Sequence, residues 1–168
     1  MRSAPIFFSS CDVAYSEKTM KLIEDLKEFV KLLDAHEVKY LVVGGVAVNT
    51  LAYIRATEDF DFWLQRSEEN AEKTIAALSE FGFTGEFSKA DLLDPKAVLM
   101  LGRPPNRIDL LTWISGCEFD ACWARRTYED VDGVVVPMIA LPDLLVNKKA
   151  SARHKDLADV EEIEKRKK

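Results

Sequence analysis

Apolar residues near the start of the chain recur at the spacing of one helix face. The repeat covers residues 16–36 and includes Met20, Leu22, Ile23, Leu26, Phe29, Val30 and Leu33. Residues three and four positions apart share a face of an α-helix. The pattern therefore predicts a helix over residues 16–36 that packs one face against a core.

A β-rich run and a glycine pair follow this helix. Residues 39–43 are typical of a strand, and the run ends at Gly44-Gly45. Helical spacing returns over residues 46–54. Residues 58–64 then alternate polar and aromatic side chains over their first half, which predicts a strand with one buried face. We expect this segment to form a strand, a glycine turn, a helix and a second strand.

The remaining pattern mixes helices and strands. A helix is predicted from the N-cap Ser67 to about Phe81, where Gly82 ends it. Strands are predicted at residues 97–101, 107–113 and 134–136, the first two joined by a turn through residues 102–106. Two helices follow from residue 141, with Pro142 in the first turn. We predict one α/β (α+β) domain over residues 1–168, its core at about 38–163, with a mixed β-sheet flanked by helices.

Composition and charge narrow the function classes. The 168 residues are 48% hydrophobic and 31% charged, and the chain has no apolar run of the about 20 residues that a membrane span needs. The N-terminus makes a poor signal peptide, and the three cysteines (Cys11, Cys117 and Cys122) are expected to be buried, reduced thiols, so we expect a cytoplasmic protein. The net charge of −6 argues against a protein that coats nucleic acid. Residues 148–155 are locally basic, and could bind phosphates or form a solvated helix face.

Three acidic residues are the candidates for chemistry. Asp59 and Asp61 are two residues apart on a predicted strand, so both side chains project from the same face. Asp109 lies within the apolar strand at residues 107–113, where an acid is costly to bury alone. No matching basic residue is expected on these strands. If the strands are neighbours, the three carboxylates suit Mg²⁺ and could hold two ions about 3.5–4 Å apart.

The glycine pair adds a second candidate feature. Gly44 and Gly45 end a strand and open a helix, so backbone N–H groups can approach an anion there. The spacing matches neither a dinucleotide-binding motif nor a P-loop. Taken singly, the glycines could be a plain turn and the acids solvated edge positions. Their occurrence together, in this order, favours a site for a nucleoside triphosphate.

These motifs resemble the signature of the polymerase-β-like nucleotidyltransferase superfamily. The resemblance lies in Val42-Val43-Gly44-Gly45, Asp59-Phe60-Asp61-Phe62 and Ile108-Asp109-Leu110. Longer strings, including residues 44–49, 55–61 and 144–159, are similar to bacterial minimal nucleotidyltransferases, among them abortive-infection (AbiEii-type) toxins. The chain departs from many members in carrying Gly45 where they have serine.

The resemblance implies a role for each matching residue. Asp59 and Asp61 would bind two Mg²⁺ ions, with Mn²⁺ as an alternative, and Asp109 would hold the catalytic ion and help deprotonate the acceptor. Gly44 and Gly45 would cradle the triphosphate. The implied nucleotide-binding or supporting residues are Arg55, Thr57, Lys148, Arg153 and Lys155. Asp156 and Asp159 are expected either to be helix-face acids that pair with Lys155 or to pair with the site.

Several functions stay open at this point. The first is an NTP-dependent (ATP-type) nucleotidyltransferase acting on tRNA or protein, in a toxin–antitoxin system with a cognate antitoxin. The second is a catalytically inactive nucleotide-binding or interaction module with the same fold. The third is a small-molecule (antibiotic) nucleotidyltransferase, whose acceptor pocket could use Trp63, Trp113 and Trp123 unless these pack in the core. His36 and His154 have no evident nucleophile partner, and no membrane association is expected.

Overall fold

A mixed six-stranded sheet forms the centre of the fold. The computed structural model describes residues 15–103 and 106–166. The strands are β1 (Tyr40–Val43), β2 (Asp59–Leu64), β3 (Val98–Arg103), β4 (Asn106–Leu111), β5 (Thr127–Val131) and β6 (Val134–Met138). Their order is β3-β4-β2-β1-β6-β5, with β2–β4 and β1–β6 parallel and the other neighbouring pairs antiparallel. The predicted mixed sheet is confirmed.

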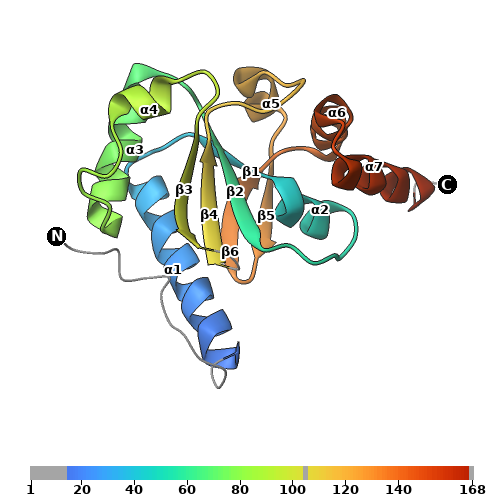
Figure 1. Cartoon of the computed structure of the whole chain (residues 1–168), viewed down its shortest axis with the longest axis horizontal. Helices are drawn as coiled ribbons and strands as arrows, with labels where there is room; N and C mark the ends of the chain where they lie inside the picture. Colours follow the sequence, from blue (N-terminus) through green and yellow to red (C-terminus); the bar gives the residue numbers. More distant parts are fainter. Residues whose placement is uncertain (1–14, 104–105, 167–168) are drawn as a thin grey trace.

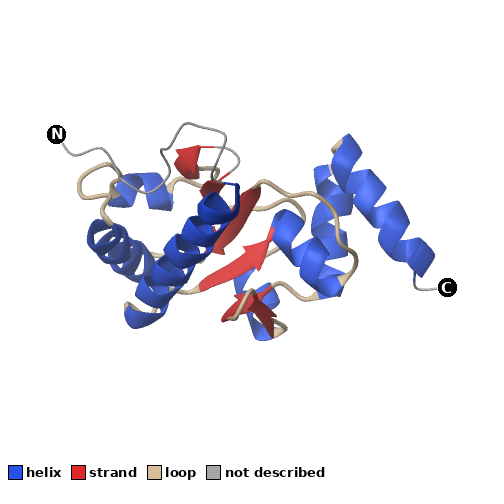
Figure 2. Cartoon of the chain, turned by 90° about the horizontal axis from the view of Figure 1, so that it is seen from below, coloured by secondary structure: helices blue, strands red, loops and turns tan. Residues whose placement is uncertain are grey.

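Helices cover both sides of this sheet. They are α1 (Tyr15–Ala35), α2 (Gly44–Leu51), α3 (Glu68–Phe81), α4 (Lys89–Leu93), α5 (Phe119–Ala124), α6 (Leu141–Ser151) and α7 (His154–Arg166). Figures 1 and 2 show α1, α3 and α4 on one side, and α2, α6 and α7 on the other. None of the helices in the described ranges combines the length and apolarity that a membrane span requires.

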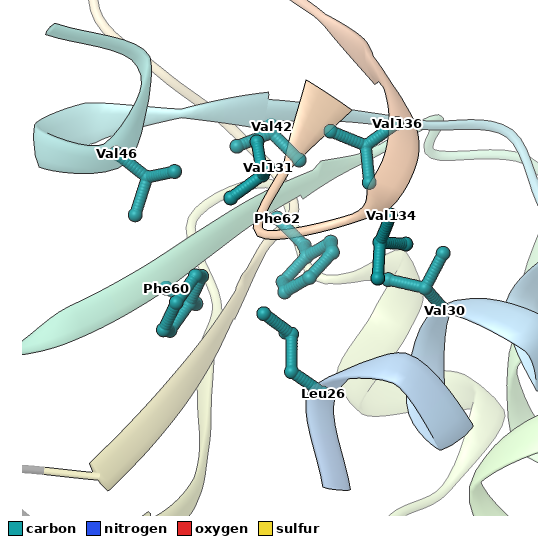
Figure 3. A pocket seen from close by; sticks show the side chains of 9 residues that line it. All are labelled: Leu26, Val30, Val42, Val46, Phe60, Phe62, Val131, Val134 and Val136. Atoms are coloured by element: carbon teal, nitrogen blue, oxygen red, sulfur yellow. The ribbon is translucent and has the colours of Figure 1, made fainter. Parts of the chain in front are cut away.

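The main core lies between α1, α3 and the sheet. Phe29 of α1 packs edge-on against Phe62 of β2, with ring centroids 5.5 Å apart. Near them a cavity of about 10 Å³ has an entirely apolar lining, which includes Leu26, Val30 and Phe60 (Figure 3). Such a space offers a water molecule no hydrogen-bond partner. Because Phe60 and Phe62 face this core, Asp59 and Asp61 face the opposite side of the sheet.

Several predicted boundaries agree closely with the structure. The hydroxyl of Ser67 caps α3 by accepting a hydrogen bond from the Asn70 N–H, and Gly82 ends the helix with φ +113°. The helix predicted from residue 46 instead begins at Gly44, so both glycines belong to its first turn. Cys122 is buried and Cys117 is half-buried, and both are free thiols.

Three short elements were not predicted: α4, α5 and β5. They have five, six and five residues, too few for a helical or alternating repeat to stand out. The expectations for Cys11 and for the prolines of the turn at residues 102–106 lie outside the described residues.

Candidate active site

Three acids lie on one face of the sheet where β2 and β4 run side by side. In the register of these parallel strands, Asp61 lies opposite Asp109. Asp59 precedes Asp61 by two residues on β2, so its side chain projects from the same face. Asp109 is only 6% exposed. The structure therefore brings together the three acids that the sequence singled out.

A fourth charged residue, Arg107, lies among them. It is opposite Asp59 in the β2–β4 register and two residues before Asp109 on β4. Its Nε donates a hydrogen bond to Asp109 Oδ1 at 2.7 Å. Its Nη2 donates to Asp109 Oδ2 at 2.9 Å and to Asp59 Oδ2 at 3.0 Å. The expectation of no matching basic residue on these strands is wrong, because Arg107 shares their face and pairs with two of the acids.

Asp61 is the acid that Arg107 does not neutralise. Burial, followed by the charges of Asp109 and Asp59, raises the pKa of Asp61 to about 6. Burial also raises the pKa of Asp59, and the nearby Arg107 offsets part of this rise. Within the described residues, no hydrogen bond or ion pair reaches the Asp61 side chain. A cation close to Asp61 would therefore relieve an unfavourable charge.

The donor set fits a divalent cation. Carboxylate oxygens are the ligands that Mg²⁺ prefers, and Asp59 Oδ1 is buried without a hydrogen-bond partner. No three Asp, Glu, His or Cys side chains of the described residues are placed to hold one ion together. The guanidinium of Arg107 bridges Asp59 and Asp109 instead. The chemistry of the residues is thus suitable, and a shared ion would require these side chains to move.

Gly44 joins β1 to α2 directly beside the acids. Its φ of +67° lies in the left-handed region that favours glycine. A Cβ atom at this position would overlap Asp61 Oδ2 and lie 2.8 Å from Asp61 Cγ. The N-cap of α2, Val43, offers no side-chain hydrogen bond to the first N–H groups of the helix. The absence of a side chain at Gly44 therefore brings a helix N-terminus suited to anions next to the carboxylates.

Thr57 explains why position 45 is glycine. A Cβ atom at Gly45 would overlap Thr57 Oγ1 and lie 2.9 Å from Thr57 Cβ. The hydroxyl of Thr57 therefore occupies the space that a serine at position 45 would need. Thr57 thus supports the glycine turn by direct contact.

A cleft of about 540 Å³ opens over this face of the sheet. Its lining includes Gly44, Asp61 and Asp109, together with Trp113, which is 47% exposed. Asn147 and Ser151 of α6 also line the cleft, as does Arg153, the residue before α7. The cleft gives a ligand access to Asp61, Asp109 and Gly44 at once.

The basic residues at positions 148–155 lie in different surroundings, some at the cleft or the surface and one in the protein interior. Arg153 lines the cleft, and its Nε donates to Asp156 Oδ2 at 2.6 Å. Lys155 is exposed, and its positive charge lowers the pKa values of Asp59 and Asp61. Burial has the larger effect, so both pKa values are raised overall. Lys148 is only 3% exposed and does not line the cleft.

Lys148 forms a buried charge network with the two aspartates of α7. Its Nζ lies 2.9 Å from Asp156 Oδ1 and 2.7 Å from Asp159 Oδ2. Asp159 also accepts hydrogen bonds from the Tyr53 hydroxyl at 2.6 Å and from Arg55 Nη2 at 3.0 Å. Both aspartates therefore pair with Lys148, and Asp159 also pairs with the loop before β2, so they are not helix-face acids that pair with Lys155. The network connects α6 and α7 to the segment that precedes β2.

The Lys148→Met variant should lose about 3–5 kcal/mol of unfolding free energy, because it leaves two buried carboxylates without their shared partner. Urea unfolding followed by circular dichroism measures this loss. Lys149→Met is the matched control, since Lys149 is adjacent in sequence but forms an exposed ion pair with Glu164. Equal stability of the two variants would contradict the importance of the buried network.

This network also has an expected pH dependence. Burial alone would raise the pKa of Asp156, but hydrogen bonds from Lys148, Arg153 and Ser151 lower it to about 2. A lowered carboxyl pKa stabilises the fold above the unfolded pKa near 4, and this contribution is lost as the pH falls toward 2. The free energy of unfolding of Lys148→Met should therefore fall less steeply than that of the wild-type chain as the pH drops from about 4 to about 2.

Comparison with known proteins identifies a family for this chain. A family model described as "Nucleotidyl transferase of unknown function (DUF2204)" matches residues 22–168. A search of curated proteins gives no match. The matched stretch contains the glycine turn, the three acids and the network of α6 and α7. Because the match covers most of the chain, the protein belongs to this nucleotidyltransferase family.

Proposed function

We propose that this protein transfers a nucleoside monophosphate from an NTP to an acceptor hydroxyl or phosphate, with release of pyrophosphate, in the cytoplasm. The observation that carries the proposal is the convergence of Asp59, Asp61 and Asp109 beside the side-chain-free turn at Gly44. Family membership supports nucleotidyl transfer as the reaction class. The NTP, the metal and the acceptor are parts of this proposal.

The three acids would hold Mg²⁺, as two ions, with Mn²⁺ as an alternative. When bound, these ions would activate the acceptor oxygen and neutralise charge on the leaving pyrophosphate. The N-terminal N–H groups of α2, which include that of Gly45, would bind phosphate oxygens. The chain then needs no nucleophile of its own, because its residues position the reacting groups and balance their charge.

Basic residues around the cleft would complete the phosphate site. Arg153 lines the cleft and is held by Asp156, so its remaining N–H groups can bind a phosphate. Lys155 is close enough to affect the acids electrostatically. The ammonium of Lys148 binds Asp156 and Asp159, so we assign it a positioning role behind Arg153 rather than direct contact with phosphate. Arg55 would support the site through Asp159 in the same way.

The acceptor would approach the acids past Trp113, which lines the cleft. A second cleft of about 460 Å³ is also lined by Trp113, together with Trp63, Phe119, Glu118 and Asp120. These aromatic and acidic residues suit a small-molecule acceptor, which is the second candidate beside tRNA or protein. Trp63 itself is buried and packs edge-on against Phe119, while Trp123 stacks on Phe119, so Trp113 is the tryptophan with most surface to offer a ligand.

Incubation with Mg²⁺ and each α-labelled NTP, against separate tRNA, protein and small-molecule extracts, tests the proposal. We expect label from one NTP to appear in one acceptor class, and chelation by EDTA to abolish it. NTP binding without transfer would instead indicate a catalytically inactive nucleotide-binding module. Co-purification with a neighbour-encoded protein, without transfer, would favour an interaction module of the toxin–antitoxin type. Transfer to tRNA or protein that a co-purified partner blocks would support a toxin with a cognate antitoxin.

A further inference from the structure

Arg107 engages the oxygen atoms that a divalent cation would need. It contacts Asp59 and Asp109 through three hydrogen bonds of 2.7 to 3.0 Å. We propose that Arg107 is a tethered counter-cation that competes with the divalent cation for Asp59 and Asp109, so that the ion binds only as the guanidinium withdraws. The inference rests on the proposed function, which identifies the metal ligands. It adds that Arg107 determines when Asp59 and Asp109 are free to bind the ion.

Arg107 occupies most of the carboxylate oxygens of Asp59 and Asp109 that could bind a cation. Three of their four carboxylate oxygens accept hydrogen bonds from Arg107. The fourth, Asp59 Oδ1, is buried without a partner. An arginine that pairs with one acid at the surface would leave the other acid free, but this guanidinium bridges both.

The metal and the guanidinium cannot share these oxygens in the same geometry. Mg²⁺ binds oxygen at 2.0–2.1 Å with near-octahedral directions, which requires the carboxylates to turn toward one point. The planar guanidinium spreads Asp59 and Asp109 along its edge at longer distances. This difference agrees with the finding that, within residues 15–103 and 106–166, no three His, Cys, Asp or Glu side chains are placed to hold one ion. Exchange of one cation for the other is therefore a switch between two side-chain arrangements.

Arg107 also has a route out of the site. Its side chain is 25% exposed, whereas the Asp109 side chain is 9% exposed. A long, partly solvated side chain can swing to the rim while the strand that carries it stays in place. Arg107 forms its hydrogen bonds with Asp59 and Asp109 and not with Asp61, so Asp61 stays available to an arriving ion. Asp61 would provide the first ligand for the ion, and Asp59 and Asp109 would join it as the guanidinium leaves.

Competition of this kind lowers the apparent metal affinity by the fraction of molecules in which the acids are free. The Arg107→Met variant removes the tethered cation and keeps much of the side-chain bulk. We expect it to bind Mn²⁺ more tightly than the wild-type chain, on the order of tenfold, in titrations of the metal alone by calorimetry or electron paramagnetic resonance. We also expect it to be less stable than wild type in EDTA, and to gain more thermal stability from Mn²⁺.

A second variant and a matched control keep the test decisive. Arg107→Lys keeps one charge but cannot bridge both acids with the same fork, so it should also bind Mn²⁺ more tightly, even if Arg107→Met folds poorly. Arg125→Met removes an arginine that forms the same type of two-point contact with Asp143, away from the three acids. This control should leave Mn²⁺ affinity unchanged.

The outcomes separate this inference from the proposed function. Unchanged or weaker Mn²⁺ binding in both Arg107 variants, with clear binding in wild type, would overturn the competition and leave the metal site standing. No Mn²⁺ binding in any of these proteins would overturn the competition and also remove the metal basis of the proposed reaction. Tighter binding in both variants would support the switch, whatever the NTP and acceptor turn out to be.

Discussion

The Asp61→Asn variant should lose nucleotidyl transfer by a factor on the order of a thousand while becoming more stable than the wild-type chain. The amide keeps the shape of the side chain but removes a ligand that Mg²⁺ prefers. Loss of metal stabilisation worth several kcal/mol in the transition state corresponds to this fall in rate. Label transferred from the NTP at saturating Mg²⁺ measures the change in activity.

The gain in stability follows from the charge that the substitution removes. Burial and the neighbouring Asp109 and Asp59 raise the pKa of Asp61 to about 6. A raised carboxyl pKa means that the folded protein binds a proton more readily than the unfolded chain, so wild-type stability falls as the pH rises from about 4 to about 6. With EDTA present, Asp61→Asn should lack this decline and be roughly 2–3 kcal/mol more stable at pH 7.

Glu58→Gln is the matched control for both readouts. Glu58 is exposed and belongs to the same segment, but it lies outside the face that carries the acids. It should keep both the activity and the pH dependence of the wild-type chain. Full turnover in Asp61→Asn would reject the assignment of Asp61 to the metal, and lower stability at neutral pH would reject the charge explanation.

The sequence predicted helices correctly wherever their apolar repeat was long enough to recognise. The helix over residues 16–36 and the cap and stop of α3 at Ser67 and Gly82 were predicted within one or two residues, because helical repeats and capping chemistry are local. The pairing of Asp61 with Asp109 was predicted only conditionally. Register between strands 48 residues apart depends on tertiary packing, which a single sequence does not encode in any local pattern.

Two basic residues near the site form ion pairs that were not predicted from the sequence. No basic partner for the acids was predicted, although Arg107 stands two residues before Asp109 on the same predicted strand. The period-two rule that grouped Asp59 with Asp61 would have placed Arg107 beside Asp109 as well. The resemblance implies that Lys148 binds the phosphates, but its ammonium lies buried against Asp156 and Asp159. Its burial depends on two aspartates eight and eleven residues later, a partnership that only the packing of α6 on α7 reveals.

The Gly44→Ala variant should lose about 2–5 kcal/mol of unfolding free energy and most of its transfer activity. Two effects add at this position. An alanine in the left-handed region costs about 1–2 kcal/mol, and forcing extra atoms into a packed site costs about 1–3 kcal/mol more. The added Cβ would overlap Asp61 Oδ2, so relief requires that the metal-binding carboxylate or the start of α2 shift. Either movement would disturb the proposed contact between phosphates and acids.

Gly85→Ala separates the two effects. Gly85 has a similar φ of +76°, but a Cβ atom there would meet no atom within 4 Å. This control should show the backbone cost alone and keep full Mg²⁺-dependent transfer, as measured by urea unfolding and the labelled-NTP assay. If Gly44→Ala were no less stable than Gly85→Ala and equally active, the close approach of Gly44 to Asp61 would have no role in the site. A larger loss confined to Gly44→Ala would tie the glycine of the turn to the carboxylate that lies against it.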